Sequence, residues 1–125
     1  MKAKVLIVDD SSLARRTLRQ SLEDLGYAVD EASEGSQALE RFFLNPPDLV
    51  ILDLVMTGMY GADVLVKMRE INPEAKVIIA TADVQNATAA QVRSAGAVGL
   101  INKPVGRDKL ATALHTVIEG GHLWN

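Results

Sequence analysis

A short apolar run enclosed by two aspartates constrains the fold of this chain more than any other stretch. Residues 49–52 read Leu-Val-Ile-Leu, with Asp48 before them and Asp53 after them. An unbroken apolar run of this length is typical of a strand buried on both faces, as in a parallel sheet. The strand would end at Asp53, at the edge where open α/β sheets bind ligands. Taken alone, Asp53 is more simply explained as a turn residue that closes the strand.

The rest of the chain repeats a strand followed by a helix. Further strands are predicted at residues 5–8, 27–32, 76–80 and 98–101. Apolar residues at helical spacing predict helices at residues 12–25, 35–44, 64–71, 84–95 and 110–118. Ser11 and Ser12 are N-cap candidates for the first helix, and Gly26 stops it. Five strands alternating with helices predict an α/β fold: a doubly wound parallel sheet with right-handed crossovers and helices on both faces.

Composition narrows the class of protein. The chain has 125 residues, which we interpret as a single domain of 1–125, with a core of about 4–119 and a short tail of 120–125. A net charge of -3 argues against a nucleic-acid-binding surface, and the absence of cysteine excludes thiolate zinc sites and thiol nucleophiles. We find no signal peptide and no apolar stretch near the ~20 residues of a membrane span. The expectation is a soluble cytoplasmic protein without membrane contacts.

Chemically useful side chains follow four of the predicted strands. Asp9 and Asp10 follow the first strand, Asp53 ends the third, Thr81 ends the fourth, and Lys103 follows the fifth. Because the carboxyl ends of parallel strands share one edge, these side chains should meet in one small pocket. Three close carboxylates either raise one another's pKa or hold a cation, and an all-oxygen site with few ligands favours Mg²⁺. A carboxylate nucleophile beside Mg²⁺, a lysine and a threonine suits phosphoryl transfer.

Each of these residues also has a simpler explanation. Asp9 and Asp10 could favour the positive amino end of the following helix. Thr81 could be an ordinary β-branched strand residue, and Lys103 a solvated loop lysine. Their convergence on one predicted edge favours the functional interpretation over these separate explanations.

The combination resembles the receiver domain of two-component response regulators, and in layout its single-domain, CheY-like members. The resemblance covers residues 5 to about 119. Four motifs in this order and spacing carry it: Asp9-Asp10, the strand ending at Asp53, Thr81-Ala82 and Lys103-Pro104. It implies a flavodoxin-like (βα)5 fold with strand order 2-1-3-4-5.

The resemblance also implies roles for the pocket residues. Asp53 would accept a phosphoryl group from the phosphohistidine of a histidine kinase. Asp10 and Asp53 would bind Mg²⁺ directly, together with the backbone carbonyl of Val55, and Asp9 would act mainly through water. No organic cofactor is expected.

Lys103 would pair with Asp53 and then with its phosphate. Thr81 would move toward the phosphate and switch the surface formed by the fourth helix, fifth strand and fifth helix. The Lys103-Pro104 bond would be cis, a form found in only ~5–6% of X-Pro bonds.

Three positions bear on how closely the family pattern is followed. Thr57 stands where the family usually has proline, so the loop after Asp53 should differ in shape. Leu100 stands where an aromatic usually partners the threonine, which weakens the expectation of the standard output route. Asp83 adds negative charge beside the expected phosphate path.

These observations predict a signalling module and not a metabolic enzyme: it would catalyse only its own phosphorylation and dephosphorylation. The expected partners are a histidine kinase or phosphotransfer protein, and an unidentified output protein. Lys109, Thr112 and His115 of the fifth helix are candidate output contacts, unless they are simply a solvated face. One alternative is a receiver-like scaffold that binds partners without phosphorylation. A flavin or nucleotide binder is set aside, because Asp9-Asp10-Ser11-Ser12 is too acidic for a phosphate loop.

Overall fold

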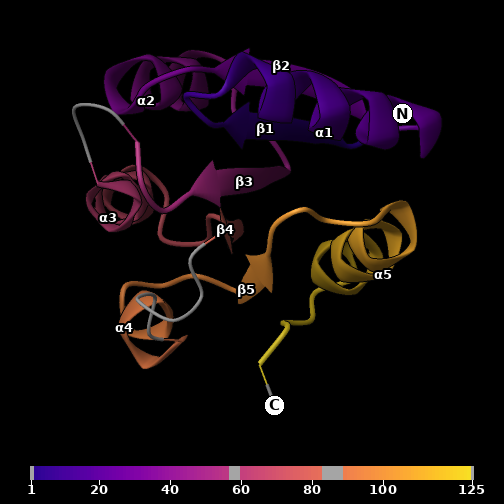
Figure 1. The fold of residues 1–125 in the computed structure, drawn as a ribbon. Coiled ribbons are helices and arrows are strands. Elements are labelled where there is room, and N and C mark those ends of the chain that lie inside the picture. The colour runs from indigo at the N-terminus through magenta and orange to yellow at the C-terminus, as the bar shows by residue number, and fades with distance from the viewer. Residues whose placement is uncertain (1, 57–59, 83–88, 125) are drawn as a thin grey trace.

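The described residues form a parallel sheet with helices on both faces (Figure 1). The computed structural model describes residues 2–56, 60–82 and 89–124. The strands are β1 (Lys4–Val8), β2 (Ala28–Ala32), β3 (Leu49–Asp53), β4 (Val77–Thr81) and β5 (Gly99–Asn102), in the order β2-β1-β3-β4-β5. The helices are α1 (Ser12–Asp24), α2 (Gly35–Leu44), α3 (Gly61–Ile71), α4 (Ala89–Ser94) and α5 (Arg107–Ile118). This confirms the predicted flavodoxin-like architecture and strand order.

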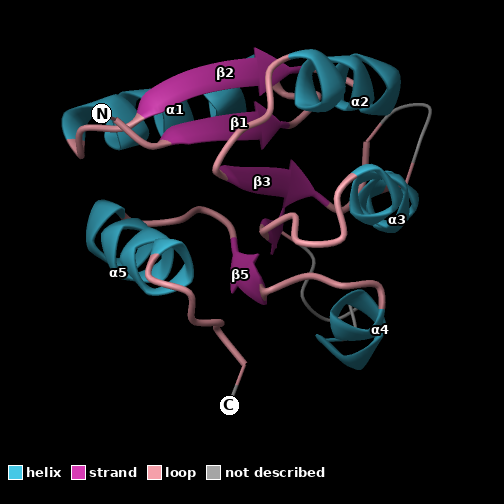
Figure 2. Ribbon diagram, turned by 180° about the vertical axis from the view of Figure 1, so that it is seen from behind, coloured by secondary structure: helices cyan, strands magenta, loops and turns pink. Residues whose placement is uncertain are grey.

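Two apolar cores lie on opposite faces of the sheet, under the helices that Figure 2 shows from behind. Alternate strand residues point to opposite faces, so Leu6 of β1 packs toward α2, α3 and α4, whereas Ile7 packs toward α1 and α5. All four residues of the apolar run at 49–52 are at most 1% exposed. The prediction that this strand is buried on both faces is confirmed. The end of the buried run places the end of β3 at Asp53.

Local signals in the sequence explain where the first helix starts and stops. Ser11 caps α1, because its side-chain oxygen accepts a hydrogen bond of 3.2 Å from the backbone N–H of Ala14. Gly26 follows the helix with φ of 95°, a left-handed conformation that side chains with a Cβ seldom adopt. The cap positions the start of α1 directly after Asp9 and Asp10.

Details of α2, β2 and α4 bear on the sequence-based expectation. Phe43, one of the apolar residues in the helix predicted at 35–44, is 66% exposed. The edge strand β2 carries Asp30 and Glu31, which pair with arginines of the neighbouring helices α2 and α1. The described residues of α4, Ala89–Ser94, lie within the helix predicted at 84–95. Thr57, Asp83 and the first residues of that predicted helix lie outside the described residues.

None of the helices in the described ranges is long and apolar enough to cross a membrane. After α5 the chain turns back at Gly120, and its last described residues run along the outer side of β5, away from β4 (Figure 1). The tail is bonded to the residue just before β5, because the Leu123 N–H donates to the Val98 carbonyl at 2.8 Å.

Candidate functional site

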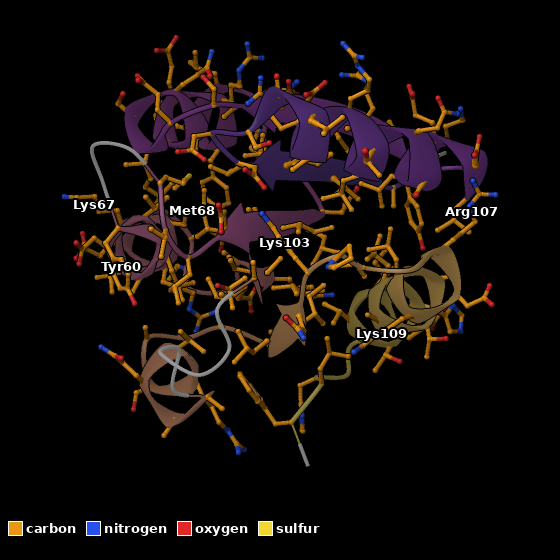
Figure 3. All side chains as sticks on the ribbon, viewed as in Figure 1. Tyr60, Lys67, Met68, Lys103, Arg107 and Lys109 are labelled. Atoms are coloured by element: carbon orange, nitrogen blue, oxygen red, sulfur yellow. The ribbon has the colours of Figure 1, made fainter. Side chains whose placement is uncertain are left out.

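The five candidate residues lie where the strands of the sheet end. Asp9 and Asp10 follow β1, Asp53 is the last residue of β3, Thr81 is the last residue of β4, and Lys103 directly follows β5. In Figure 3 the Lys103 side chain extends from the β5–α5 connection toward the end of β3. The structure therefore brings the carboxylates and the ammonium together, as the parallel topology requires.

Three carboxylates form the centre of this site. Asp9, Asp10 and Asp53 each place one carboxylate oxygen within 4.8 Å of the others. Their environments differ, since Asp9 is buried, Asp53 is partly buried and Asp10 is exposed. Three like charges at this spacing repel one another, and burial strengthens the repulsion because less water screens it. The cluster therefore favours a bound cation.

Lys103 contributes the ammonium of the site. Its Nζ donates to Oδ2 of Asp9 in a close ion pair, and it lies 3.5 Å from Oδ2 of Asp53. The family resemblance implied pairing with Asp53 first, whereas here the closer partner is Asp9. Because its side chain is 22% exposed, Lys103 can contact both carboxylates and still reach toward solvent.

Asp9 is held in place by groups that the sequence analysis did not assign to the site. The Ser11 N–H donates to Oδ1 of Asp9 at 2.9 Å, and Lys103 occupies the other carboxylate oxygen. The Arg15 guanidinium donates to the Asp9 backbone carbonyl at 2.6 Å, while it also pairs with Glu31 on β2. The proximity of Ser11 in sequence could have suggested its contact. Arg15 carries no comparable signal, because its contact depends on how α1 packs.

The surroundings of Asp53 raise the pKa of its carboxyl group. The largest cause is desolvation by burial, and the negative charge of Asp9 acts in the same direction. The charge of Lys103 and a backbone hydrogen bond from Val55 oppose this rise. The folded structure thus disfavours the ionised form of Asp53, which is the nucleophilic form. A cation at the acidic cluster would act in the opposite direction.

Thr81 and the residues after β5 complete the edge. Thr81 is 2% exposed, and its backbone carbonyl accepts a hydrogen bond of 2.9 Å from the Lys103 N–H. This bond links the ends of β4 and β5, so it fixes the point from which the Lys103 side chain extends. The Lys103-Pro104 bond is cis, as the resemblance implied.

A glycine that the sequence analysis did not assign to the site sets the position of Asp53. Gly61, the first residue of α3, donates its N–H to the Leu54 carbonyl at 2.7 Å. A Cβ on Gly61 would lie 2.3 Å from the Asp53 carbonyl oxygen and 2.8 Å from the Leu54 Cα. Glycine is therefore required for α3 to start this close to the end of β3. Val55, whose carbonyl is a candidate ligand, lies within the same tight connection and is exposed.

The acidic cluster fits Mg²⁺ on the chemistry of its donors. All candidate ligands are oxygen atoms, and the exposed side of the cluster at Asp10 leaves room for the water molecules that Mg²⁺ retains. Lys103 forms ion pairs with two of these three carboxylates, those of Asp9 and Asp53, and a divalent cation at the cluster would offset further negative charge.

Comparisons with known proteins agree with this geometry. The family model described as "Response regulator receiver domain" matches residues 5–115. The chemotaxis protein CheY of Thermotoga maritima is 36% identical over 118 residues, which cover 94% of this chain and 98% of that protein. The chemotaxis protein CheY of Bacillus subtilis is 32% identical over 119 residues, covering 94% and 99% respectively.

A solved structure extends the likeness to three dimensions. A chain of the CheX-CheY-BeF3-Mg²⁺ complex from Borrelia burgdorferi is similar with a TM-score of 0.86 and 30% sequence identity. The match covers 92% of this chain and 88% of that one. Sequence and structure thus point to the same class of protein.

Proposed function

This chain belongs to the response regulator receiver family, and we propose that it is a phosphorylation-driven switch whose phosphoacceptor is Asp53. One observation carries the proposal: Asp53 ends the central strand β3 within the three-carboxylate cluster, 3.5 Å from the Lys103 ammonium. Receivers of this family are signalling proteins of two-component systems. The phosphoryl donor would be the phosphohistidine of a histidine kinase or of a phosphotransfer protein.

The chemical step uses the Asp53 carboxylate as nucleophile. One carboxylate oxygen forms a bond to phosphorus as the phosphorus–nitrogen bond of the donor breaks, and the leaving imidazole keeps the electron pair. Hydrolysis reverses the modification: a water oxygen bonds to phosphorus, and the carboxylate leaves. Because burial raises the Asp53 pKa, the site must stabilise the ionised form for the first step to proceed.

Mg²⁺ would be held by Asp10, Asp53 and the Val55 carbonyl, with Asp9 acting through water. When bound, Mg²⁺ supplies positive charge that offsets the phosphoryl oxygens. Lys103 would contribute in the same direction, by moving between the carboxylates of Asp9 and Asp53 and the new phosphoryl group. Its present contacts with both aspartates place it within reach of that group.

Thr81 would report the phosphorylation to the rest of the molecule. Thr81 is buried at the end of β4, and its carbonyl accepts a hydrogen bond from the backbone at the end of β5. A movement of Thr81 would therefore shift β5. The output surface in this proposal consists of α4, β5 and α5, and an unidentified protein would bind there. The chain would act in the cytoplasm as a single receiver domain, without direct contact with nucleic acid or membrane.

The test is the mass of the intact protein after incubation with Mg²⁺ and acetyl phosphate. We expect the native chain to gain one acid-stable, base-labile phosphoryl group, and to gain none when EDTA removes the metal. The Asp53→Asn variant should gain none under either condition.

Asp48 supplies a matched control, because it flanks the same strand at the opposite edge and its carboxylate accepts a hydrogen bond from the Lys4 N–H at 2.7 Å. Asp48→Asn should be phosphorylated like the native chain. If no chain gains a phosphoryl group from acetyl phosphate or from a histidine kinase, the switch proposal is wrong. The alternative, a scaffold that binds partners without phosphorylation, would then replace it.

A further inference from the structure

The tail after α5 covers the open edge of the sheet. β5 is the last strand in the order β2-β1-β3-β4-β5, so within the described part of the chain no strand pairs with its outer side. The Leu123 N–H donates to the Val98 carbonyl at 2.8 Å, and the indole N–H of Trp124 donates to the Ala97 carbonyl at 3.0 Å. The tail therefore satisfies two carbonyls of the residues just before β5. An extended segment that bonds to a sheet edge is a common mode of peptide recognition.

The two tail side chains pack on opposite faces of the sheet. Trp124 packs against the core beneath α4, where Leu100 also lies, and Leu123 packs against the core beneath α5. The Arg93 guanidinium of α4 lies over the Trp124 ring, 5.6 Å from its centroid, in a cation–π contact. The tail is thus recognised by backbone carbonyls, two apolar surfaces and one cation.

Gly99 makes this contact possible. A Cβ at Gly99 would meet three side-chain atoms of Leu123, at 2.5, 2.7 and 2.8 Å, and these are its nearest neighbours. The absence of a side chain on β5 therefore creates the space that Leu123 fills. A groove of about 490 Å³ lies next to Leu123, and residues of β5 and α5, including Lys109 and Thr112, line it.

We propose that the outer side of β5, between α4 and α5, is a binding site for a short extended peptide with an aliphatic and an aromatic side chain. The resident ligand is the chain's own segment Leu123-Trp124. This proposal rests on the proposed function only in identifying the α4–β5–α5 surface as the output surface. A partner that uses the site must displace the tail, so the tail lowers the apparent affinity of the output surface for that partner.

The contacts that hold the tail are few enough for a partner segment to displace it. The tail makes two hydrogen bonds to residues just before β5, and each contributes little in net terms because water competes for the same groups. Its tether adds an effective concentration in the millimolar range, which a competing segment must overcome. A partner segment that also fills the groove beside Leu123 would gain contacts that the tail does not make.

Trp124 is the only tryptophan in the chain, so its fluorescence reports the tail directly. In the full-length protein without Mg²⁺ or phosphodonor, acrylamide should quench Trp124 less than free N-acetyltryptophanamide. Gly99→Ala should raise the quenching constant by about twofold, because it expels Leu123 and exposes the half-buried ring. Gly106→Ala is the matched control: a Cβ there meets nothing within 4 Å, and quenching should not change. Thermal melts check that both variants are folded.

A second experiment asks whether the site accepts a separate peptide. The Leu123→Ala/Trp124→Ala variant of the whole chain contains no tryptophan, so an added peptide Gly-Gly-His-Leu-Trp-Asn supplies the only tryptophan fluorescence. At millimolar protein the peptide tryptophan should become protected from acrylamide, and adding Gly99→Ala to the variant should abolish the protection. Native Trp124 quenched as readily as the free indole would overturn the proposal, as would a peptide that stays unprotected. Neither experiment uses phosphorylation, so failure here is distinct from failure of the phosphoacceptor proposal.

Discussion

Replacement of Gly61 by alanine tests how the fold positions Asp53. The new Cβ would lie 2.3 Å from the Asp53 carbonyl oxygen, 2.8 Å from the Leu54 Cα and 3.0 Å from the Leu54 carbonyl oxygen. Carbon atoms in comfortable contact are about 3.5–4.0 Å apart, so the start of α3 and the end of β3 must separate by about 1 Å. Both neighbours are backbone, which cannot rotate away as a side chain can.

The magnitude follows from what holds the two segments. β3 is paired with β1 on one side and β4 on the other, so it cannot retreat without straining both ladders. Overpacking of this kind costs about 1–3 kcal/mol, and we expect the upper part of that range. Alanine regains up to about 1 kcal/mol of helix propensity relative to glycine. The net loss should be about 2 kcal/mol, which lowers the melting temperature by several degrees for a domain of this size.

Two measurements check this prediction. Urea unfolding at neutral pH gives the loss of stability, with Gly106→Ala as control, since alanine there has open space and costs only a weaker helix cap. Phosphoryl gain from acetyl phosphate should also be slower in Gly61→Ala, because the backbone that carries Asp53 has moved. If Gly61→Ala is as stable as Gly106→Ala and is phosphorylated at the native rate, the contact does not position Asp53 as argued.

Three further variants probe the charges and the cap around the site. Lys103→Met leaves the buried Asp9 carboxylate without its cation, so urea unfolding at pH 7 should show a loss of about 3 kcal/mol, and a variant as stable as the native chain would contradict this. Because the folded structure raises the Asp53 pKa, the contribution of this carboxyl group to stability is greatest below its ordinary value of 3.8 and falls as the pH rises through the higher folded value. Asp53→Asn should therefore be more stable than the native chain at pH 7 and lose that advantage below 3.8, and a variant less stable at pH 7 would refute the assignment. Ser11→Ala removes the hydroxyl that accepts from Ala14, so thermal unfolding should show a loss of about 1 kcal/mol, whereas Ser11→Thr should retain most of the stability.

The sheet could be predicted because its signals are local. The buried run at residues 49–52 marks β3 without reference to any other segment, and Ser11 and Gly26 mark the ends of α1. Once the strands are parallel, topology alone places Asp53 and Lys103 at the same edge, 50 residues apart in the chain. The gathering of the site residues was therefore predictable, although their chemical roles remain predictions.

Other features of the site depend on contacts that no local sequence pattern predicts. Nothing in the sequence pairs Lys103 more closely with Asp9 than with Asp53, since that depends on where the β5–α5 connection leaves the sheet. Arg15 contacts the Asp9 carbonyl because α1 packs beside β1 and β2. Gly61 looks like any loop glycine until α3 is placed against β3. These residues act through tertiary packing, and tertiary packing is decided by distant parts of the chain.

The tail is the clearest case of this limit. Leu123 and Trp124 follow a glycine pair with no periodicity that would predict a strand or helix. Their partners, the carbonyls of Val98 and Ala97, become available because β5 lies at the edge of the sheet. A sequence pattern indicates which conformation a segment prefers by itself. The contact of the tail depends instead on which strand lies at the edge of the sheet.

The most direct test of the account is to locate the phosphoryl group by chemical trapping. Borohydride reduces an acyl phosphate to an alcohol, so a phosphorylated aspartate is recovered as homoserine in the peptide map. After treatment with Mg²⁺ and acetyl phosphate, we predict homoserine at position 53 and unchanged aspartate at positions 9, 10 and 48. Homoserine at position 9 or 10 with Asp53 unchanged would contradict the central claim that Asp53 is the nucleophile.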